Sequence, residues 1–207
     1  MAITNHNKQD VFTRILNRAV KEGKANQKSK ESRQWLMQRA ANSTRTNANN
    51  LMSKLGQDRR KTNVEIGQMY FFRYSAKHAE TLPYWDAVPL IFPFADHGKH
   101  FLGYNLHYAP PKVRGLLLDK LYSIANNRNF DHTTRLNLSY QTLKAARKFR
   151  YLQPCIHMYL KPQMRSRFVQ VNGNEWSMAL FLPLAEWQKA DAARVYSDTL
   201  KKVKGRR

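Results

Sequence analysis

The stretch GQMYFFRYSAKHAETLPYWDAVPLIFPFADHGKHFLGYNLHYAPP, residues 67–111, decides the fold that the sequence predicts. Three short runs in it, 69–74, 89–94 and 100–108, are rich in the aromatic and branched residues that favour strands. Residues 96–99, with the sequence Asp-His-Gly-Lys, form a turn that joins the last two runs as a hairpin. The stretch therefore predicts a small SH3-like β-barrel or a strongly twisted sheet.

Positions inside these runs indicate how the sheet is deformed. Pro89 and Pro93 lack a backbone N–H, so their run is expected at an edge of the sheet or in a bent strand. Gly103 indicates a bulge or the close approach of another backbone. Apolar and polar residues alternate from 104 to 108, which predicts that the third strand continues to residue 108.

The chain after the sheet is predicted to be mainly helical. Pro110 and Pro111 end the sheet and begin a helix whose apolar residues recur at helical spacing up to Asn126. A second helix is predicted from near Asp131 to about Phe149. The remaining predicted pieces are a compact helical or turn-like segment at 154–160, a return strand at 165–171 that adds to the sheet, a helix opened by Pro183 and passing through Trp187, and a helix at 192–203.

Charge is the dominant feature of the composition. The 207 residues include 36 Lys and Arg against 14 Asp and Glu, a formal net charge of +22. This excess indicates an anionic partner, which is nucleic acid, an acidic protein surface or an anionic membrane. No apolar run approaches the roughly 20 residues that cross a bilayer, so no membrane partner is predicted. The single cysteine, Cys155, excludes an intramolecular disulfide framework and a zinc knuckle.

Residues 1–63 form a basic, polar leader. Three short helices are predicted in it, one ended by Gly23, one capped by Ser32 and one stopped by Gly56. None has enough apolar surface to be stable alone, so the leader either stays mobile or folds against a partner. Trp35 favours ordering on a partner, because an exposed tryptophan in a disordered tail is uncommon.

Together these patterns predict an α+β protein in three parts. A basic N-terminal arm, made of short helices or extended, spans residues 1–63. A folded domain at 64–190 packs the small barrel or twisted sheet with helices, and a basic C-terminal helix or tail occupies 191–207.

Four segments of the chain resemble a known family. They are residues 67–74, 82–86, 89–90 and 101–108, with the sequences GQMYFFRY, LPYWD, PL and FLGYNLHY. Over these segments, and with further matches up to residue 190, the chain resembles the DNA end protector family of virion proteins from contractile-tailed bacteriophages. The leader falls outside the resemblance.

The resemblance implies a virion protein without catalytic activity or cofactor, assembled in the host cytoplasm. Such a protein enters the particle late, near the portal, neck or tail, binds the end of the packaged genome and shields it from exonucleases. The implied partners are DNA and other subunits of the portal, neck, tail or baseplate, in several copies within a symmetric assembly. The resemblance assigns no functional residues.

Cationic side chains are the candidate binding residues, because a protein that neutralises phosphates gains affinity from released counterions. The nine candidates are Lys144, Arg147, Lys148 and Arg150 on one predicted helix face, Arg165 and Arg167 after it, and Arg59, Arg60 and Lys61 at the end of the leader. Their contacts would position a duplex without reading its sequence. Two alternatives are a solvated helix face and contact with an acidic phage subunit.

Residues suited to catalysis or metal binding form no group in the sequence. His97, His100 and His107 lie near the hairpin, but the odd spacing of the last two puts them on opposite faces of a regular strand. The carboxylates of the predicted domain form no close pair of the kind that holds a nuclease metal. Cys155 and His157 are two residues apart, and a buried structural cysteine is favoured over a thiol–imidazole pair. We predict no catalytic residue, metal ligand or cofactor.

Two functions remain open from the sequence. The first is non-catalytic binding of genome ends, which predicts salt-sensitive, sequence-independent DNA binding and protection against exonucleases. The second is a structural adaptor of the neck, tail tube or baseplate whose basic arms wrap neighbouring subunits. The adaptor predicts a defined copy number in the particle and no measurable DNA affinity at physiological salt. A metal-dependent nuclease is a third, less favoured alternative.

Overall fold

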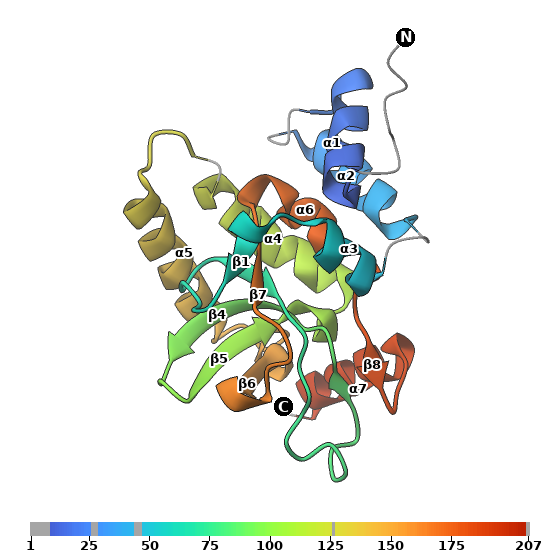
Figure 1. Cartoon of the computed structure of the whole chain (residues 1–207), viewed down its shortest axis with the longest axis vertical. Coiled ribbons are helices and arrows are strands. Elements are labelled where there is room, and N and C mark those ends of the chain that lie inside the picture. The colour runs from blue at the N-terminus through green and yellow to red at the C-terminus, as the bar shows by residue number, and fades with distance from the viewer. Residues whose placement is uncertain (1–8, 26–28, 44–46, 126, 206–207) are drawn as a thin grey trace.

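The computed structural model describes residues 9–25, 29–43, 47–125 and 127–205 (Figure 1). These residues form seven α-helices and a six-stranded antiparallel sheet, which confirms the predicted α+β class. The strands of that sheet are β1 (Arg60–Lys61), β2 (Met69–Phe71), β4 (Leu90–Asp96), β5 (His100–Asn105), β6 (Ile156–Leu160) and β7 (Phe168–Val171). Two further strands, β3 (Trp85–Asp86) and β8 (Trp187–Gln188), pair with each other outside it.

The main sheet is open, so the alternative of a closed barrel was wrong. Its described strands follow the order β1-β7-β2-β4-β5-β6, which leaves β1 and β6 as unpaired edges. One face packs against the helices, and the other carries a separate aromatic cluster centred on Phe72. The Phe72 ring meets those of Phe168 and Tyr159 edge to face, with centroids 5.1 and 5.4 Å apart. Each face therefore buries its own apolar side chains without closure of the sheet.

The hairpin and its deformations agree with the sequence prediction. Gly98 adopts a left-handed conformation, with φ of 72°, in the turn between β4 and β5. Pro93 lies inside β4 and Pro89 directly precedes it. This strand is central rather than at an edge, and it is bent where the register shifts between Pro93 and Ala95. A Cβ on Gly103, which pairs with Pro93, would lie 3.4 Å from the Phe92 carbonyl oxygen. The predicted close approach at Gly103 is thus confirmed.

Three predicted elements were wrong, each because a non-local or side-chain contact decided the backbone. The strand ends at Asn105, whose side chain accepts a hydrogen bond from the His107 N–H at 3.0 Å and starts the 3₁₀ turn η2 (Leu106–Tyr108). Residues 156–160 are the edge strand β6, paired with β5, rather than a helix or turn. Residues 183–187 form no helix, because Trp187 enters β8 opposite β3.

The leader is helical and packed over its described residues, which agrees with the alternative of short helices and not with that of an extended arm. Its three predicted helices are present as α1 (Val11–Lys21), α2 (Lys30–Ala41) and α3 (Ala48–Lys54). The cap of α2 is Ser29 rather than Ser32. Phe12, Leu36 and Leu51 are buried in the same core as the sheet, and α1–α3 lie together beside α6 (Trp176–Ala179) (Figure 1). The rest of the chain supplies the apolar surface that these helices lack. Division of the chain at residues 63 and 190 stays a prediction.

The helices after the sheet are α4 (Pro111–Ala125), α5 (His132–Ala146) and α7 (Ala192–Lys204), as predicted except at their ends. Asp131 caps α5 by accepting a hydrogen bond from the Thr134 N–H. Helix α5 ends at Ala146, three residues before the predicted end, and Arg147 is its C-cap. No helix within the described ranges is both long and apolar enough to cross a membrane.

Candidate nucleic-acid interface

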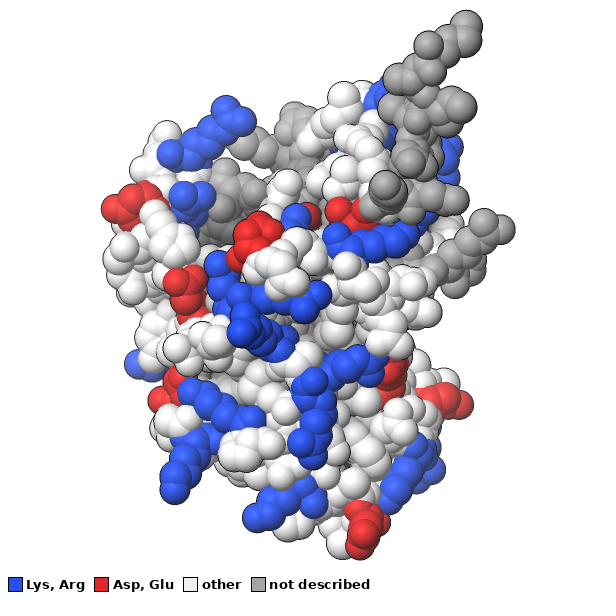
Figure 2. All heavy atoms as spheres, in the orientation of Figure 1, with Lys and Arg blue, Asp and Glu red and all other residues white. Residues whose placement is uncertain are grey.

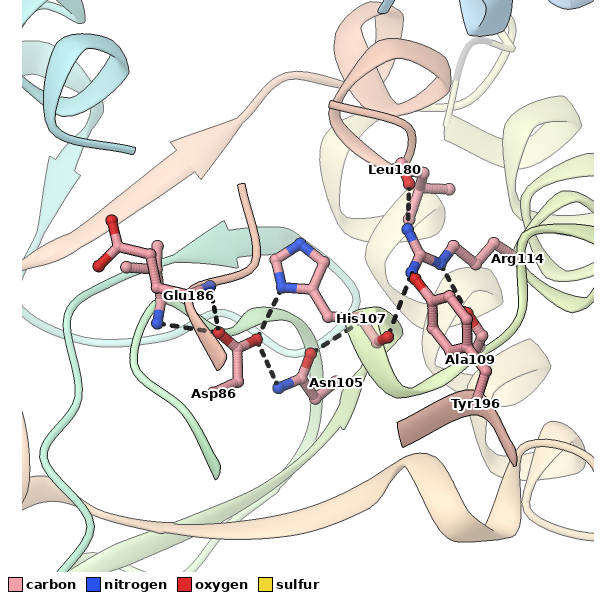
Figure 3. A network of polar contacts seen from close by, with 9 residues as sticks. Asp86, Asn105, His107, Ala109, Arg114, Leu180, Glu186 and Tyr196 are labelled. Carbon is pink, nitrogen blue, oxygen red and sulfur yellow. Dashed lines mark hydrogen bonds and ion pairs between the residues drawn. The ribbon is translucent and has the colours of Figure 1, made fainter. Parts of the chain in front are cut away.

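A buried polar network surrounds Asp86 at the junction of β3, β5 and the segment before β8 (Figure 3). The Asp86 carboxylate accepts hydrogen bonds from His107 Nδ1 at 2.7 Å and Asn105 Nδ2 at 3.1 Å. It also accepts from the backbone N–H groups of Val88 at 3.0 Å and Glu186 at 3.2 Å. Burial opposes its charge, but the neighbouring His107 and these hydrogen bonds hold the pKa of Asp86 below its usual value.

The Asp86–His107 pair has the composition of a catalytic dyad but lacks the access that catalysis needs. Both side chains are 1% exposed, so no substrate reaches them in this conformation. One of the four donors, the Val88 N–H, is two residues away, and the other three come from β5, η2 and the segment before β8. The network therefore joins these segments, which is a structural role.

A buried cation, Arg114 of α4, is held by neutral acceptors (Figure 3). Its Nε donates to the Ala109 carbonyl and its Nη1 to the Leu180 carbonyl, both at 2.7 Å. Its Nη2 donates to the His107 carbonyl at 3.1 Å and to the Tyr196 hydroxyl at 2.5 Å. Burial lowers the pKa of Arg114. The sequence did not single out this residue, because an arginine among helical apolar positions reads like any surface arginine.

Cys155 and His157 do not form a catalytic pair. Burial raises the pKa of the Cys155 thiol to about 12 and lowers the pKa of His157 to about 4, so both are neutral near pH 7. The thiol contacts the Tyr151 carbonyl at 3.8 Å, and the imidazole packs against the Tyr108 ring with centroids 4.0 Å apart. The prediction of a buried structural cysteine is confirmed.

The two hairpin histidines, His97 and His100, lie next to each other. The rings of His97 and His100 have centroids 5.1 Å apart, and the Asp96 carboxylate pairs with Lys161 at 2.9 Å. His107 is in the buried network, away from the strand position predicted for it. Across the described part of the chain, no three His, Cys, Asp or Glu side chains gather as a metal-binding group.

A hollow of about 450 Å³ brings together cations that are far apart in the sequence. We call it the arginine hollow and define it by Arg60, Arg73, Arg165 and Arg167, which line it together with Asn49 and Ser53 of α3. Figure 2 shows Lys and Arg side chains gathered near the centre of the visible face, over β1 and β7. Three of the four arginines were predicted binding residues. Arg73 was missed, because it lies inside a predicted strand.

Backbone pairing explains this convergence. Arg60 of β1 pairs with Val169 of β7, which places it beside the segment that carries Arg165 and Arg167. The Arg165 N–H donates to the Arg73 carbonyl at 2.8 Å, and the Arg73 N–H donates to Ser166 Oγ at 2.8 Å. The two chain segments are thus held against each other by hydrogen bonds.

The charges of the arginine hollow are only partly compensated. Arg73 meets the Glu186 carboxylate at 3.4 and 3.5 Å and also donates to Asn49 Oδ1. Arg60 Nη2 donates to the Met52 carbonyl at 3.2 Å, while its buried Nε has no partner among the described residues. Arg165 and Arg167 are exposed and take part in none of the ion pairs of the described chain.

The other two candidates at the end of the leader differ from each other. Arg59 forms a two-pronged ion pair with the buried Glu175, at 2.5 and 2.9 Å, and this hydrogen bonding raises the pKa of Arg59. Its charge is neutralised inside the protein, so we leave Arg59 out of the binding set. Lys61 is exposed on the edge strand β1 and lines a second hollow next to Arg60.

The candidates after residue 143 do not form one helix face, so that prediction was wrong. Lys144 lies on α5, but Lys148 and Arg150 follow the end of the helix. The Arg147 guanidinium lies over the Phe94 ring at 5.5 Å, and Arg150 donates to the Val203 carbonyl near the end of α7 at 2.5 Å. Arg147 and Arg150 are thus engaged by other residues of the protein. The exposed Lys144 and Lys148 are the better candidates for binding an anion in this region.

An apolar groove between α4 and α5 was not predicted from the sequence. It measures about 690 Å³ and is lined by Leu116, Phe149 and Lys120 among others. Leu116 is 58% exposed and Phe149 is 41% exposed. Such exposed apolar surface is typical of contact sites for other proteins.

Comparison with protein families gives a match over nearly the whole chain. A family model described as the phage T4 terminal DNA protecting protein matches residues 3–203. The match includes residues 3–63 of the leader and α7 up to Val203, which the resemblance at 64–190 did not cover. No curated protein and no solved structure matches the chain.

Proposed function

Because the chain belongs to the family of the phage T4 terminal DNA protecting protein, we propose that it binds the ends of phage DNA and protects them without catalysis. The observation that carries the proposal is the match over residues 3–203 of 207. The net charge of +22 supports it, since such a charge attracts the phosphate backbone.

The proposed contact surface is the basic face around β1 and β7. Arg60, Lys61, Arg165 and Arg167 present their charges there without forming an ion pair in the described chain. Lys144 and Lys148 extend the proposed set at the end of α5. Contacts to phosphates are independent of base sequence, which suits a protein that must bind whatever sequence ends the genome.

Protection follows from coverage of the end rather than from a reaction. An exonuclease must reach the terminal nucleotides, and a tightly bound basic protein blocks that access. We further propose that the protein acts in the virion, in several copies, in contact with portal, neck, tail or baseplate subunits.

The test compares linear and circular duplexes of equal length. We expect tighter binding to the linear form, survival of linear DNA during exonuclease digestion, and an affinity that falls steeply with salt. Equal binding to both forms without protection would contradict the proposal.

A triple variant tests whether this basic face is the surface that contacts DNA. Lys61→Ala/Arg165→Ala/Arg167→Ala is expected to reduce the log–log salt slope by up to about 3, at about 0.9 per lost phosphate contact. The control is Lys112→Ala/Arg128→Ala/Lys204→Ala, which removes the same charge from exposed positions elsewhere. If the control weakens binding equally, net charge rather than this surface determines affinity.

A structural adaptor is the second candidate, and the groove between α4 and α5 favours it. The groove has Lys120 in its lining and no acidic residue, and a second copy of the chain carries +22 itself. Its occupant would therefore be an acidic segment of another subunit with apolar anchors. The adaptor predicts that Leu116→Glu/Phe149→Glu blocks incorporation into particles, whereas Val20→Glu, at a 67% exposed position, does not. Normal incorporation of the double variant would exclude this use of the groove.

A further inference from the structure

We propose that the arginine hollow binds the terminal phosphate monoester of a DNA end. This inference rests on the proposed function and specifies which chemical group of the DNA end is recognised. Four features of the hollow carry it: fixed backbone positions, excess positive charge, a buried donor without a partner, and a concave shape.

The hollow is built by the fold rather than by chance proximity of mobile side chains. The β1–β7 pairing fixes Arg60. The opposite wall is fixed by two hydrogen bonds, from the Arg165 N–H to the Arg73 carbonyl and from the Arg73 N–H to Ser166 Oγ. Ser166 Oγ also donates to the Arg167 carbonyl at 2.9 Å, which orders the backbone of the third arginine. Guanidinium groups on an ordered backbone lose less conformational freedom when they bind a ligand.

Positive charge exceeds negative charge in the hollow. Its lining contains four arginines and no acidic residue. Glu186, which contacts Arg73 from outside the lining, is the one carboxylate paired with any of the four in the described chain. Like charges held close together repel, so an anion between Arg60, Arg165 and Arg167 stabilises their arrangement.

Arg60 supplies a donor that lacks an acceptor. Its Nη2 is bound to the Met52 carbonyl, but its Nε is buried and has no partner in the described chain. A buried donor of this kind costs free energy unless a ligand or water supplies an acceptor. An anion in the hollow would supply one.

Shape and charge favour a terminal phosphate over an internal one. An internal phosphodiester carries one charge and is flanked by sugars on both sides. A terminal monoester projects from the chain, offers three oxygens and carries close to two charges at neutral pH. It can enter a hollow of about 450 Å³ and accept forked hydrogen bonds from several guanidinium groups.

The experiment uses the full-length protein and one duplex sequence with three kinds of end: 5′-phosphate, 3′-phosphate, and hydroxyl at both positions. Binding and survival against an exonuclease are measured for each. We expect at least about tenfold tighter binding to one phosphate-bearing end than to the hydroxyl end. The 5′ and 3′ arms identify which terminus supplies the phosphate.

Variants then locate the effect. Arg165→Ala and Arg167→Ala are expected to lower the affinity for phosphate-bearing ends more than the affinity for hydroxyl ends, so that the preference for phosphate is lost. The matched control is Lys112→Ala, which removes one exposed charge on α4 and should keep the preference. Inorganic phosphate provides a test on the unmodified protein: against chloride at equal ionic strength, it should compete with phosphate-bearing ends and not with hydroxyl ends.

The outcomes separate this inference from the proposed function. Protection of all three kinds of end with equal affinity would overturn the terminal-phosphate site and leave end binding intact. Failure to protect any end would overturn the proposed function and the site with it. A phosphate preference that survives in both arginine variants would also overturn the assignment to this hollow.

Discussion

Arg114 and the arginine hollow hold the same side-chain type in opposite situations. Arg114 is 5% exposed and donates to three carbonyls and one hydroxyl of its own chain. Arg165 and Arg167 are exposed, and Arg60 has a buried donor without a partner in the described chain. A cation whose donors are used internally stabilises the fold, whereas cations with unused donors remain available to a ligand. Burial and partners, rather than residue type, separate the two roles.

Loss of the Arg114 guanidinium is expected to have the largest effect on stability. Arg114→Met leaves buried carbonyls of Ala109, Leu180 and His107 without donors, so the free energy of unfolding should fall by about 3–5 kcal/mol. Urea denaturation measures it. Lys112→Met, on the exposed side of the same helix, should change it by less than about 0.5 kcal/mol. Equal effects of the two variants would remove the contrast between structural and free cations.

Acidification tests whether the region around His157 is sealed. Burial depresses the pKa of His157 from 6.5 to about 4, so the fold favours the neutral imidazole. The unfolded chain takes up a proton below about pH 6.5 and the folded chain does so only near pH 4, so stability is lost as pH falls through this window. The loss amounts to up to about 3 kcal/mol.

His157→Gln should flatten that pH dependence, because glutamine does not titrate. His97→Gln, at an exposed position, should leave the dependence unchanged. Urea denaturation at pH 7, 5.5 and 4.5 gives the comparison. A flat profile for the unmodified protein would show that the imidazole is solvated. The Asp86 carboxylate, whose pKa is also lowered, loses its contribution at still lower pH, below its usual 3.8.

Gly67 tests the connection between the edge strand β1 and the helical side of the protein. Its φ is +94°, and a Cβ there would lie 3.0 Å from the Leu136 carbonyl oxygen of α5. Gly67→Ala is expected to cost roughly 2–3 kcal/mol, from backbone strain and from the contact. Gly98→Ala has a similar φ of +72° with open space around it, and should cost only about 1 kcal/mol. Thermal or urea unfolding of both variants separates the cost of backbone strain from the cost of the contact with α5. Equal losses of stability would show that α5 shifts to accommodate the added methyl group.

Removing the exposed arginines should have the smallest effect on stability. Arg165→Ala/Arg167→Ala is expected to change the free energy of unfolding by less than about 0.5 kcal/mol, because both side chains are exposed and in no ion pair of the described chain. Urea denaturation measures this change alongside the binding assays. A loss above about 2 kcal/mol would make the arginine hollow a structural feature, like the site of Arg114.

Local signals predicted the elements that local interactions determine. The hairpin around Gly98, the start of α4 at the double proline and the Asp131 cap of α5 could all be read from neighbouring residues. The resemblance of the strand segments to a phage family also came from contiguous residues, and the family match confirms it. The aromatic runs predicted a sheet, yet not whether it closes, because closure depends on pairing between distant strands.

The sequence predicted the charge of the binding surface but not its position in the fold. Composition alone predicted a basic protein with an anionic partner, and three of the four arginines in the hollow were among the predicted residues. Their convergence depends on β1 pairing with β7 and on the hydrogen bonds beside Arg73, which join residues about a hundred positions apart. The use of Arg59 by Glu175 likewise depends on a long-range contact.

The sequence by itself determined the α+β class, most helices, the curved hairpin, the charge and the family. Each of these depends on residue type or on neighbours within one turn or strand. The tertiary structure alone decided that the sheet is open, that the described leader packs on the body, and which arginines are buried and which remain free. Those outcomes depend on burial and on pairing across the chain, and the free energy of a charged side chain is set by its surroundings rather than by its identity.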